Sequence, residues 1–191
     1  NKDLLRLRKA NGGLNPDLIF VTGDIAYGVN PRCGSMEDQY LAAGIFLDDL
    51  LKVCGIPKDR LFLVPGNHDI CKEEILDSST NWLSQCTLQN IEDLLQQADT
   101  DIGEWPSINK RLDHYRAFMD DILEADHIPN NPCSIYTKKV IVNGLQVGIA
   151  GFNTAWSSTG AGEKEKGELW FGGRWQYLNL PNKLTKCHIN I

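Results

Sequence analysis

The sequence predicts an α/β fold built around a parallel sheet. Two apolar runs, at 17–22 and 61–64, indicate buried strands because they lack the alternation of a sheet with one wet face. The stretch between them carries apolar residues at helical spacing from Tyr40 to Cys54. Strand, helix and strand in this order form a βαβ unit, in which the two strands are parallel.

Local signals set the bounds of the helical elements. Ser35 is placed to cap the helix that runs to about Cys54, and Gly55-Ile56-Pro57 is placed to end it. Further along, apolar residues at helical spacing predict a helical insertion at 71–130. Pro106-Ser107 is expected to separate two of its helices.

A hairpin is predicted in the last third of the chain. Asn143-Gly144 is a strong hairpin signal, and strand-like segments flank it at 138–142 and 145–152. A short helix at 172–180 and a strand at 186–191 are expected to follow. These elements add a second, antiparallel group of strands to the parallel pair.

Composition limits the class of protein. The chain has 191 residues and a formal net charge of −6, with 42% hydrophobic residues, which suits one globular domain. No apolar run approaches the ~20 residues of a membrane span, and no secretory signal is seen, so we expect a cytoplasmic location without a membrane partner. The acidic balance does not favour nucleic acid as a partner. The six cysteines lack zinc-type spacing, which indicates reduced, mostly buried thiols.

Two short phrases carry the candidate chemistry. Asp24 follows a glycine at the end of the first strand, and Asn67-His68-Asp69 follows a glycine at the end of the second. The carboxyl ends of parallel strands meet at one edge of a sheet, where ligands gather. Carboxylate and amide oxygens suit hard divalent cations, and a bridging carboxylate is needed when two ions lie ~3.5–4 Å apart.

His68 and Asp69 are the candidate catalytic residues. The ring of His68 could donate a proton to a leaving group, and Asp69 could hydrogen-bond that ring and fix its tautomer. Taken alone, Gly-Asp after a strand is an ordinary turn. The two phrases together, separated by a crossover helix, favour a metal site.

These phrases resemble the calcineurin-like metallophosphoesterase superfamily. The similarity runs through residues 17–24, the helix with Gln39-Tyr40 and residues 61–69, and the hairpin that ends at 151–154 fits the family's second sheet. In character the chain is closest to the bacterial cytoplasmic phosphohydrolase branch. That branch often stands at the head of larger multidomain proteins, so we expect this chain to be part of one.

The resemblance implies an αββα sandwich, a phosphoester substrate and two divalent metal ions, namely Mn, Fe, Zn or Mg. By motif position, Asp24 would bridge the two ions, Asn67 would bind one of them, and His68 would assist catalysis. A metal-dependent phosphohydrolase or phosphodiesterase is the main prediction. Two alternatives stay open: a non-catalytic regulatory or interaction domain that keeps the fold, and a nuclease of the same superfamily.

The chain departs from the family pattern at both ends. The family's opening Asp-x-His and closing Gly-His-x-His do not occur, and His188 falls too early in the last predicted strand to be the family's lone histidine. We therefore expect residues 1–191 to be a single, partial metallophosphoesterase domain that contains the insertion at 71–130. Such a chain is expected to hold metal weakly and to be poorly active by itself.

Other residue groups have simpler interpretations. Gly-Asp-x-x-Tyr also resembles purple acid phosphatases, in which the tyrosine binds iron, but we favour loop packing for Tyr27. The polar loop at 160–167 is bounded by glycines and is not a phosphate-binding P-loop, because no Gly-Lys-Ser/Thr follows. His114 and His127 are expected to be ordinary surface or packed histidines. The remaining aromatic group favours packing over base stacking: Trp156, Trp170, Phe171, Trp175 and Tyr177.

Overall fold

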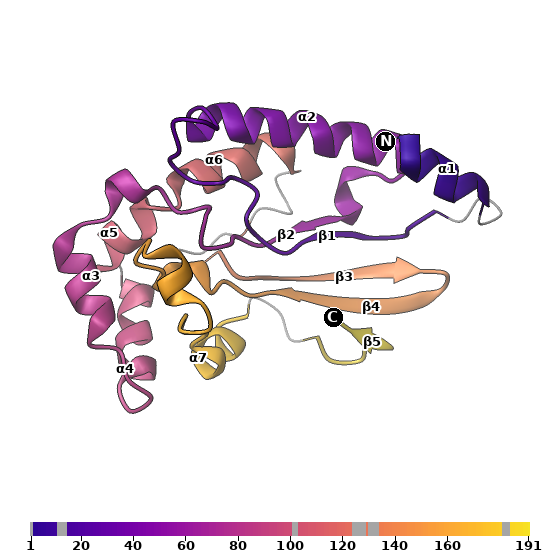
Figure 1. Ribbon diagram of the computed structural model, residues 1–191. Coiled ribbons are helices and arrows are strands. Elements are labelled where there is room, and N and C mark those ends of the chain that lie inside the picture. Colours follow the sequence, from indigo (N-terminus) through magenta and orange to yellow (C-terminus); the bar gives the residue numbers. More distant parts are fainter. Residues whose placement is uncertain (1, 11–14, 101–102, 124–128, 130–133, 181–183) are drawn as a thin grey trace.

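Two small sheets stack beneath a layer of helices in the computed structural model of this chain (Figure 1). The structure describes residues 2–10, 15–100, 103–123, 129, 134–180 and 184–191. The strands are β1 (Ile19–Val21), β2 (Leu61–Leu63), β3 (Tyr136–Val142), β4 (Leu145–Gly151) and β5 (Ile189–Asn190). The α-helices are α1 (Lys2–Ala10), α2 (Met36–Cys54), α3 (Asp77–Ser84), α4 (Ile91–Gln96), α5 (Trp105–Lys110), α6 (Asp113–Ile122) and α7 (Gly173–Leu178). Short 3₁₀ turns include η1 (Lys58–Arg60), η2 (Lys72–Glu74), η3 (Gln97–Thr100), η5 (Ala155–Ser157) and η6 (Gly162–Glu165).

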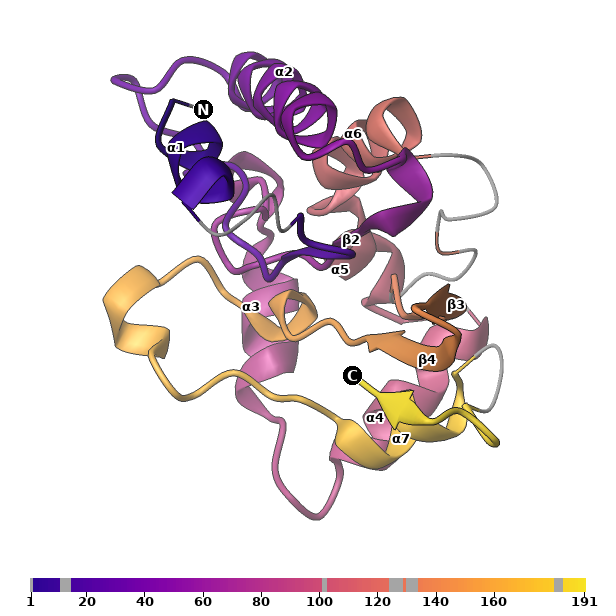
Figure 2. The ribbon, with the colours of Figure 1, turned by 90° about the vertical axis from the view of Figure 1, so that its right-hand side faces the viewer.

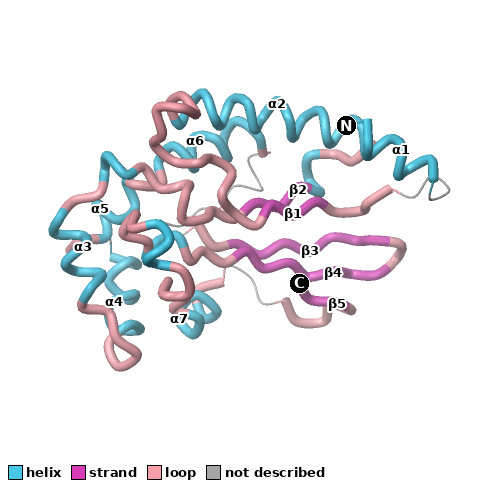
Figure 3. The backbone as a smooth tube through the Cα atoms, in the orientation of Figure 1, coloured by secondary structure: helices cyan, strands magenta, loops and turns pink. Residues whose placement is uncertain are grey.

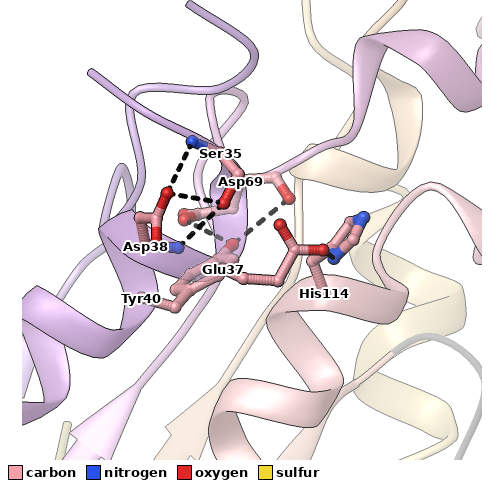
Figure 4. A network of polar contacts seen from close by, with 6 residues as sticks. All are labelled: Ser35, Glu37, Asp38, Tyr40, Asp69 and His114. Carbon is pink, nitrogen blue, oxygen red and sulfur yellow. Dashed lines mark hydrogen bonds and ion pairs between the residues drawn. The ribbon is translucent and has the colours of Figure 1, made fainter.

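The predicted βαβ unit is confirmed. Strands β1 and β2 are parallel neighbours, and the helix α2 connects them. The hydroxyl of Ser35 accepts the backbone N–H of Asp38 at 3.1 Å, and the Asp38 carboxylate accepts the N–H of Ser35 at 3.2 Å (Figure 4). This capping box starts α2, and Gly55, in the left-handed conformation with φ 68°, ends it.

Alternate side chains of β2 face two different cores. Leu61 and Leu63 pack with α2 and α6 in the first core, while Phe62 packs with Tyr136 and Val147 from the second sheet. Figure 3 shows the resulting order of layers, with helices above β1 and β2 and the second sheet below. All three residues of β2 are buried, as predicted, whereas β1 is only partly covered because Phe20 stays 39% exposed.

The second sheet is the predicted hairpin with one further strand. Strands β3 and β4 are antiparallel, and Asn143 and Gly144 turn between them with φ values of 50° and 81°. Positive φ at both turn residues is what a tight hairpin requires. Strand β5 then pairs parallel to β4. The described residues thus build a mixed α/β fold with two sheets.

The described part of the segment 71–130 consists of short helices joined by turns. Helix α6 packs on α2 in the first core. Trp105 of α5 packs with Trp156 and Trp175 in a third core, separate from the one around Phe62. Pro106 does not break the helical run; it lies in the first turn of α5, where a missing N–H costs nothing. That this segment is an insertion into a single domain stays a prediction.

Several smaller expectations are settled by the fold. Cys54, Cys71 and Cys86 are buried free thiols, Cys33 and Cys187 are free and more accessible, and Cys133 lies outside the described residues. Within the aromatic group, Trp156 and Trp175 are buried and Trp170 packs against them, whereas Phe171 and Tyr177 are exposed. In the part of the chain that the structure describes, every helix is too short or too polar to cross a bilayer.

Candidate functional site

The loop after β1, which contains Gly23 and Asp24, contacts the loop after β2, which contains Gly66, at one edge of the first sheet. We call these two segments the glycine loops. A Cβ atom added to Gly23 would lie 2.7 Å from the Cα atom of Gly66, and one added to Gly66 would lie 2.2 Å from Oδ1 of Asp24. Gly23 also has a φ of 109°, a value that residues with a side chain rarely adopt. Both glycines are therefore required where they stand, because any side chain would force the loops apart.

Asp24 is held in place by its own backbone and by the neighbouring loop. It adopts a left-handed conformation with φ 54°, which is uncommon outside glycine and is tolerated best by Asn and Asp. Its Oδ1 atom accepts the backbone N–H of His68 at 3.1 Å. The side chain is exposed, and a carboxylate has two oxygens, so Asp24 keeps an oxygen atom that can bind a cation or accept a hydrogen bond.

Asp24, Asn67 and His68 line one pocket of about 770 Å³. Asn67 and His68 are both partly buried. The Nδ1 atom of His68 lies 3.1 Å from the carbonyl oxygen of Tyr27, and the two rings stack with their centroids 5.2 Å apart. A hydrogen bond to a carbonyl requires the proton on Nδ1, so Nε2 is the nitrogen left to face a ligand.

Asp69 has different hydrogen-bond partners from the one predicted. Its carboxylate is fully buried and accepts N–H groups from both loops, at 2.9 Å from Ala26, 3.2 Å from Ile25 and 2.8 Å from Gly66. The hydroxyl of Tyr40 donates to the same carboxylate at 3.0 Å (Figure 4). The predicted hydrogen bond from Asp69 to the His68 ring is therefore replaced by the contact between that ring and Tyr27.

The environment of Asp69 is reflected in two shifted pKa values. Burial raises the pKa of the Asp69 carboxyl, and the hydrogen bonds from Ala26, Gly66 and Ile25 act against that rise. Burial, followed by the charge of Asp69, raises the pKa of the Tyr40 phenol well above its usual range. Tyr40 therefore stays protonated and keeps donating to Asp69. The Asp69 carboxylate, in turn, links the two loops by accepting N–H groups from both.

Other residues that line the pocket come from segments that the sequence did not connect to the site. Lys72 of η2 lies there, as do Gly162, Glu165 and Lys166 of the polar loop at 160–167. In the sequence, that loop is polar and bounded by glycines. Nothing in its spacing indicated that it returns to the edge where the two glycine phrases meet, so only the tertiary structure shows it.

The donor set at this pocket suits a divalent cation but is small. Asp24 and Asn67 supply oxygen atoms of the kind that hard and borderline cations prefer. Among the described residues, no group of three or more His, Cys, Asp or Glu side chains is arranged to hold a metal ion. The carboxylate of Asp24, the amide of Asn67 and the imidazole of His68 therefore fit part of a metal centre.

His114 and His188 lie away from the pocket. His114 on α6 forms a 3.1 Å contact with Glu37 on α2, as Figure 4 shows. His188 accepts the backbone N–H of Gln146 through Nδ1 at 2.9 Å, beside β5. His127 falls outside the described residues. Tyr27 is 60% exposed and stacks on His68 instead of packing into its loop.

Comparison with known proteins identifies the family. The family model described as Metallophos, calcineurin-like phosphoesterase, matches residues 2–154, which include both glycine loops and the hairpin. No curated protein and no solved structure gives a significant match to the chain. The match to the family model covers well over half of the sequence and agrees with the two-sheet fold, so this chain belongs to the calcineurin-like phosphoesterase family.

Proposed function

We propose that this chain supplies the catalytic residues of a metal-dependent phosphoesterase that hydrolyses phosphomonoesters or phosphodiesters. One observation carries the proposal: Asp24, Asn67 and His68, from loops far apart in the sequence, line a single pocket at the carboxyl edge of a parallel pair of strands. Open α/β sheets bind their ligands at this edge. Membership of the family adds support, since its members are mostly hydrolytic and generally use divalent metal ions.

Asp24 and Asn67 are the proposed metal ligands. In this assignment Asp24 bridges two divalent ions, Mn, Fe, Zn or Mg, and Asn67 binds one of them. Such ions, when bound, polarise the phosphoryl group and lower the pKa of a water molecule toward neutrality. Asn67 adds no charge, so the site stays positive toward an anionic substrate. The contact of Gly23 with Gly66 sets the distance between the two ligand-bearing loops.

His68 is the proposed proton donor to the leaving group. Its Nδ1–H is engaged by the carbonyl of Tyr27, so the doubly protonated ring would give the leaving group the proton on Nε2 and return to the neutral form. The ring cannot turn freely, because it also stacks on Tyr27. Asp69 acts in this proposal as a positioning residue: it bonds both loops from beneath and reaches the reaction only through the backbone.

Hydrolysis of bis(p-nitrophenyl) phosphate by the chain in the presence of Mn²⁺ tests the assignment. We expect Asp24→Asn to remove metal-dependent activity and His68→Ala to lower kcat by about a hundredfold. Asp49→Asn is the matched control, since Asp49 is an exposed carboxylate on α2 outside the pocket. Full activity in Asp24→Asn would refute the role of Asp24.

Metal binding gives a second readout that needs no turnover. Titration with Mn²⁺ by calorimetry is expected to show weak binding to the chain and none to Asp24→Asn. Tight binding of two ions that survives Asp24→Asn would contradict this ligand set. If the unmodified chain binds no metal and hydrolyses nothing, the alternative is a regulatory or interaction domain that keeps the fold, which the small donor set also favours.

A further inference from the structure

Two lysines line the pocket and are not used by the proposed chemistry. Lys72 and Lys166 line it together with the metal-type residues Asp24 and Asn67. Both lysines are exposed, and neither forms an ion pair with any described carboxylate. Asp24 and Glu165 supply two carboxylates to the same pocket, and the two ammonium groups offset this negative charge. The lysines are the charged groups of this lining that can attract an anion.

One buried residue connects the segments that carry these lysines. Arg111 is fully buried, and its guanidinium donates to the carbonyl oxygen of Trp156 at 2.7 Å and to that of Ser158. Its own carbonyl oxygen accepts the N–H of Cys71 at 2.8 Å, directly before Lys72. Burial lowers the pKa of the guanidinium to about 10, so it stays charged near neutral pH. Arg111 thus fixes the start of the polar loop relative to η2.

The polar loop is then folded back by an internal carboxylate. Glu165 accepts the hydroxyl of Ser158 at 2.6 Å, and it also accepts the N–H and the hydroxyl of Thr159. Glu165 is only 9% exposed, while its neighbours Lys164 and Lys166 are exposed. Figure 2 shows the segment as a long excursion, in orange, between β4 and α7. The position of Lys166 is therefore set by a buried polar network.

The loop also packs directly on the segment that bears Lys72. A Cβ atom added to Gly160 would lie 2.7 Å from Cδ1 of Ile75 and 3.4 Å from Cγ of Lys72. The aliphatic part of Lys72 thus lies against the loop, which leaves its ammonium group as the part that reaches solvent or a ligand. Both lysines are held at the pocket by contacts of their own segments.

We propose that Lys72 and Lys166 bind a second anionic group of the substrate, beyond the ester that is hydrolysed. The substrate would then be a small organic phosphoester that carries an additional phosphate. An ammonium group binds phosphate as a point charge through charge-assisted hydrogen bonds, and two of them at one pocket favour a dianion. This inference rests on the proposed function for the identity of the ester, but the binding of the second anion does not require turnover.

Nucleotide binding tests the inference directly. Thymidine 3′,5′-bisphosphate and thymidine 5′-monophosphate differ by one phosphate, and their dissociation constants for the full chain can be compared by calorimetry in Mg²⁺ buffer. We expect the bisphosphate to bind about five- to tenfold more tightly. Lys166→Ala and Lys72→Ala should each reduce that preference to about twofold or less. Lys164→Ala is the matched control, because Lys164 is exposed on the same loop but does not line the pocket.

The outcomes separate this inference from the proposed function. Equal binding of the two nucleotides, or no binding of either, would overturn the inference, as would a preference that survives both lysine variants. An equal loss of preference in Lys164→Ala would also overturn it, since the effect would then be one of general surface charge. A preference that depends on Lys72 and Lys166 without any metal-dependent hydrolysis would leave the inference standing and remove the proposed function.

Discussion

Asp69→Asn distinguishes the structural role of Asp69 from a catalytic one. The best-placed amide would keep its oxygen on the N–H groups of Ile25 and Gly66 and turn its NH₂ toward Tyr40, whose hydroxyl can accept a hydrogen bond. The N–H of Ala26, now 2.9 Å from a carboxylate oxygen, would then face an NH₂ group instead. Losing this hydrogen bond to a charged acceptor and leaving a buried donor unpaired costs about 3 kcal/mol.

Urea unfolding followed by tryptophan fluorescence measures this cost, with the free energy extrapolated linearly to water. Asp24→Asn is the matched control at the same site: Asp24 is exposed and an amide oxygen can still accept the N–H of His68, so its stability should change by less than about 0.5 kcal/mol. A stability of Asp69→Asn within 1 kcal/mol of the unmodified chain, combined with a large loss of kcat, would refute our reasoning. Asp69 would then act on the reaction itself.

Three further predictions follow from the polar loop and the thiols. Arg111→Met leaves buried carbonyl groups without donors, so urea unfolding should show a loss of about 3 kcal/mol; a loss below about 1 kcal/mol would contradict the connecting role. Burial acts to raise the pKa of Glu165, but its hydrogen bonds outweigh burial and lower it, so its stabilising effect is present above the unfolded-state value and lost as the pH falls through the folded value. The stability difference between the unmodified chain and Glu165→Gln should therefore shrink below about pH 4, and a difference that grows there would contradict the network. Burial raises the pKa of Cys86 to about 11, whereas Cys33 is exposed, so Cys33→Ser should remove one fast-reacting thiol in a titration with a disulfide reagent and Cys86→Ser should remove none.

Features that depend on local chemistry could be predicted from the sequence. The start of α2 at Ser35 and its end at Gly55 follow from capping, which involves residues only a few positions apart. The turn at Asn143 and Gly144 follows from the positive φ that these residues accept. The meeting of Asp24 with His68 could also be predicted, because the βαβ rule places both loops at the same edge.

Features that depend on distant pairs could not be predicted. Arg111 bonds residues 45 and 47 positions away, and nothing in its own helical surroundings distinguishes it from a surface arginine. Asp69 was assigned to its neighbour in the sequence, His68, although its carboxylate points the other way and meets backbone groups 43 and 44 positions away. In both cases a side chain bonds the backbone of another segment, and backbone groups leave no pattern in the sequence.

The contact between Gly23 and Gly66 bears on which cations the proposed metal site would accept. Where side chains separate two loops, they can adjust to ions of different radius by changing rotamer. Here backbone meets backbone, and an added carbon at Gly23 would already lie 2.7 Å from Gly66. The two loops therefore cannot move closer together, and the hydrogen bonds of the buried Asp69 carboxylate to both loops oppose their separation. Ion choice should then follow size and coordination number more strictly than in a pliable cage, with small ions such as Mg²⁺ preferred over Ca²⁺.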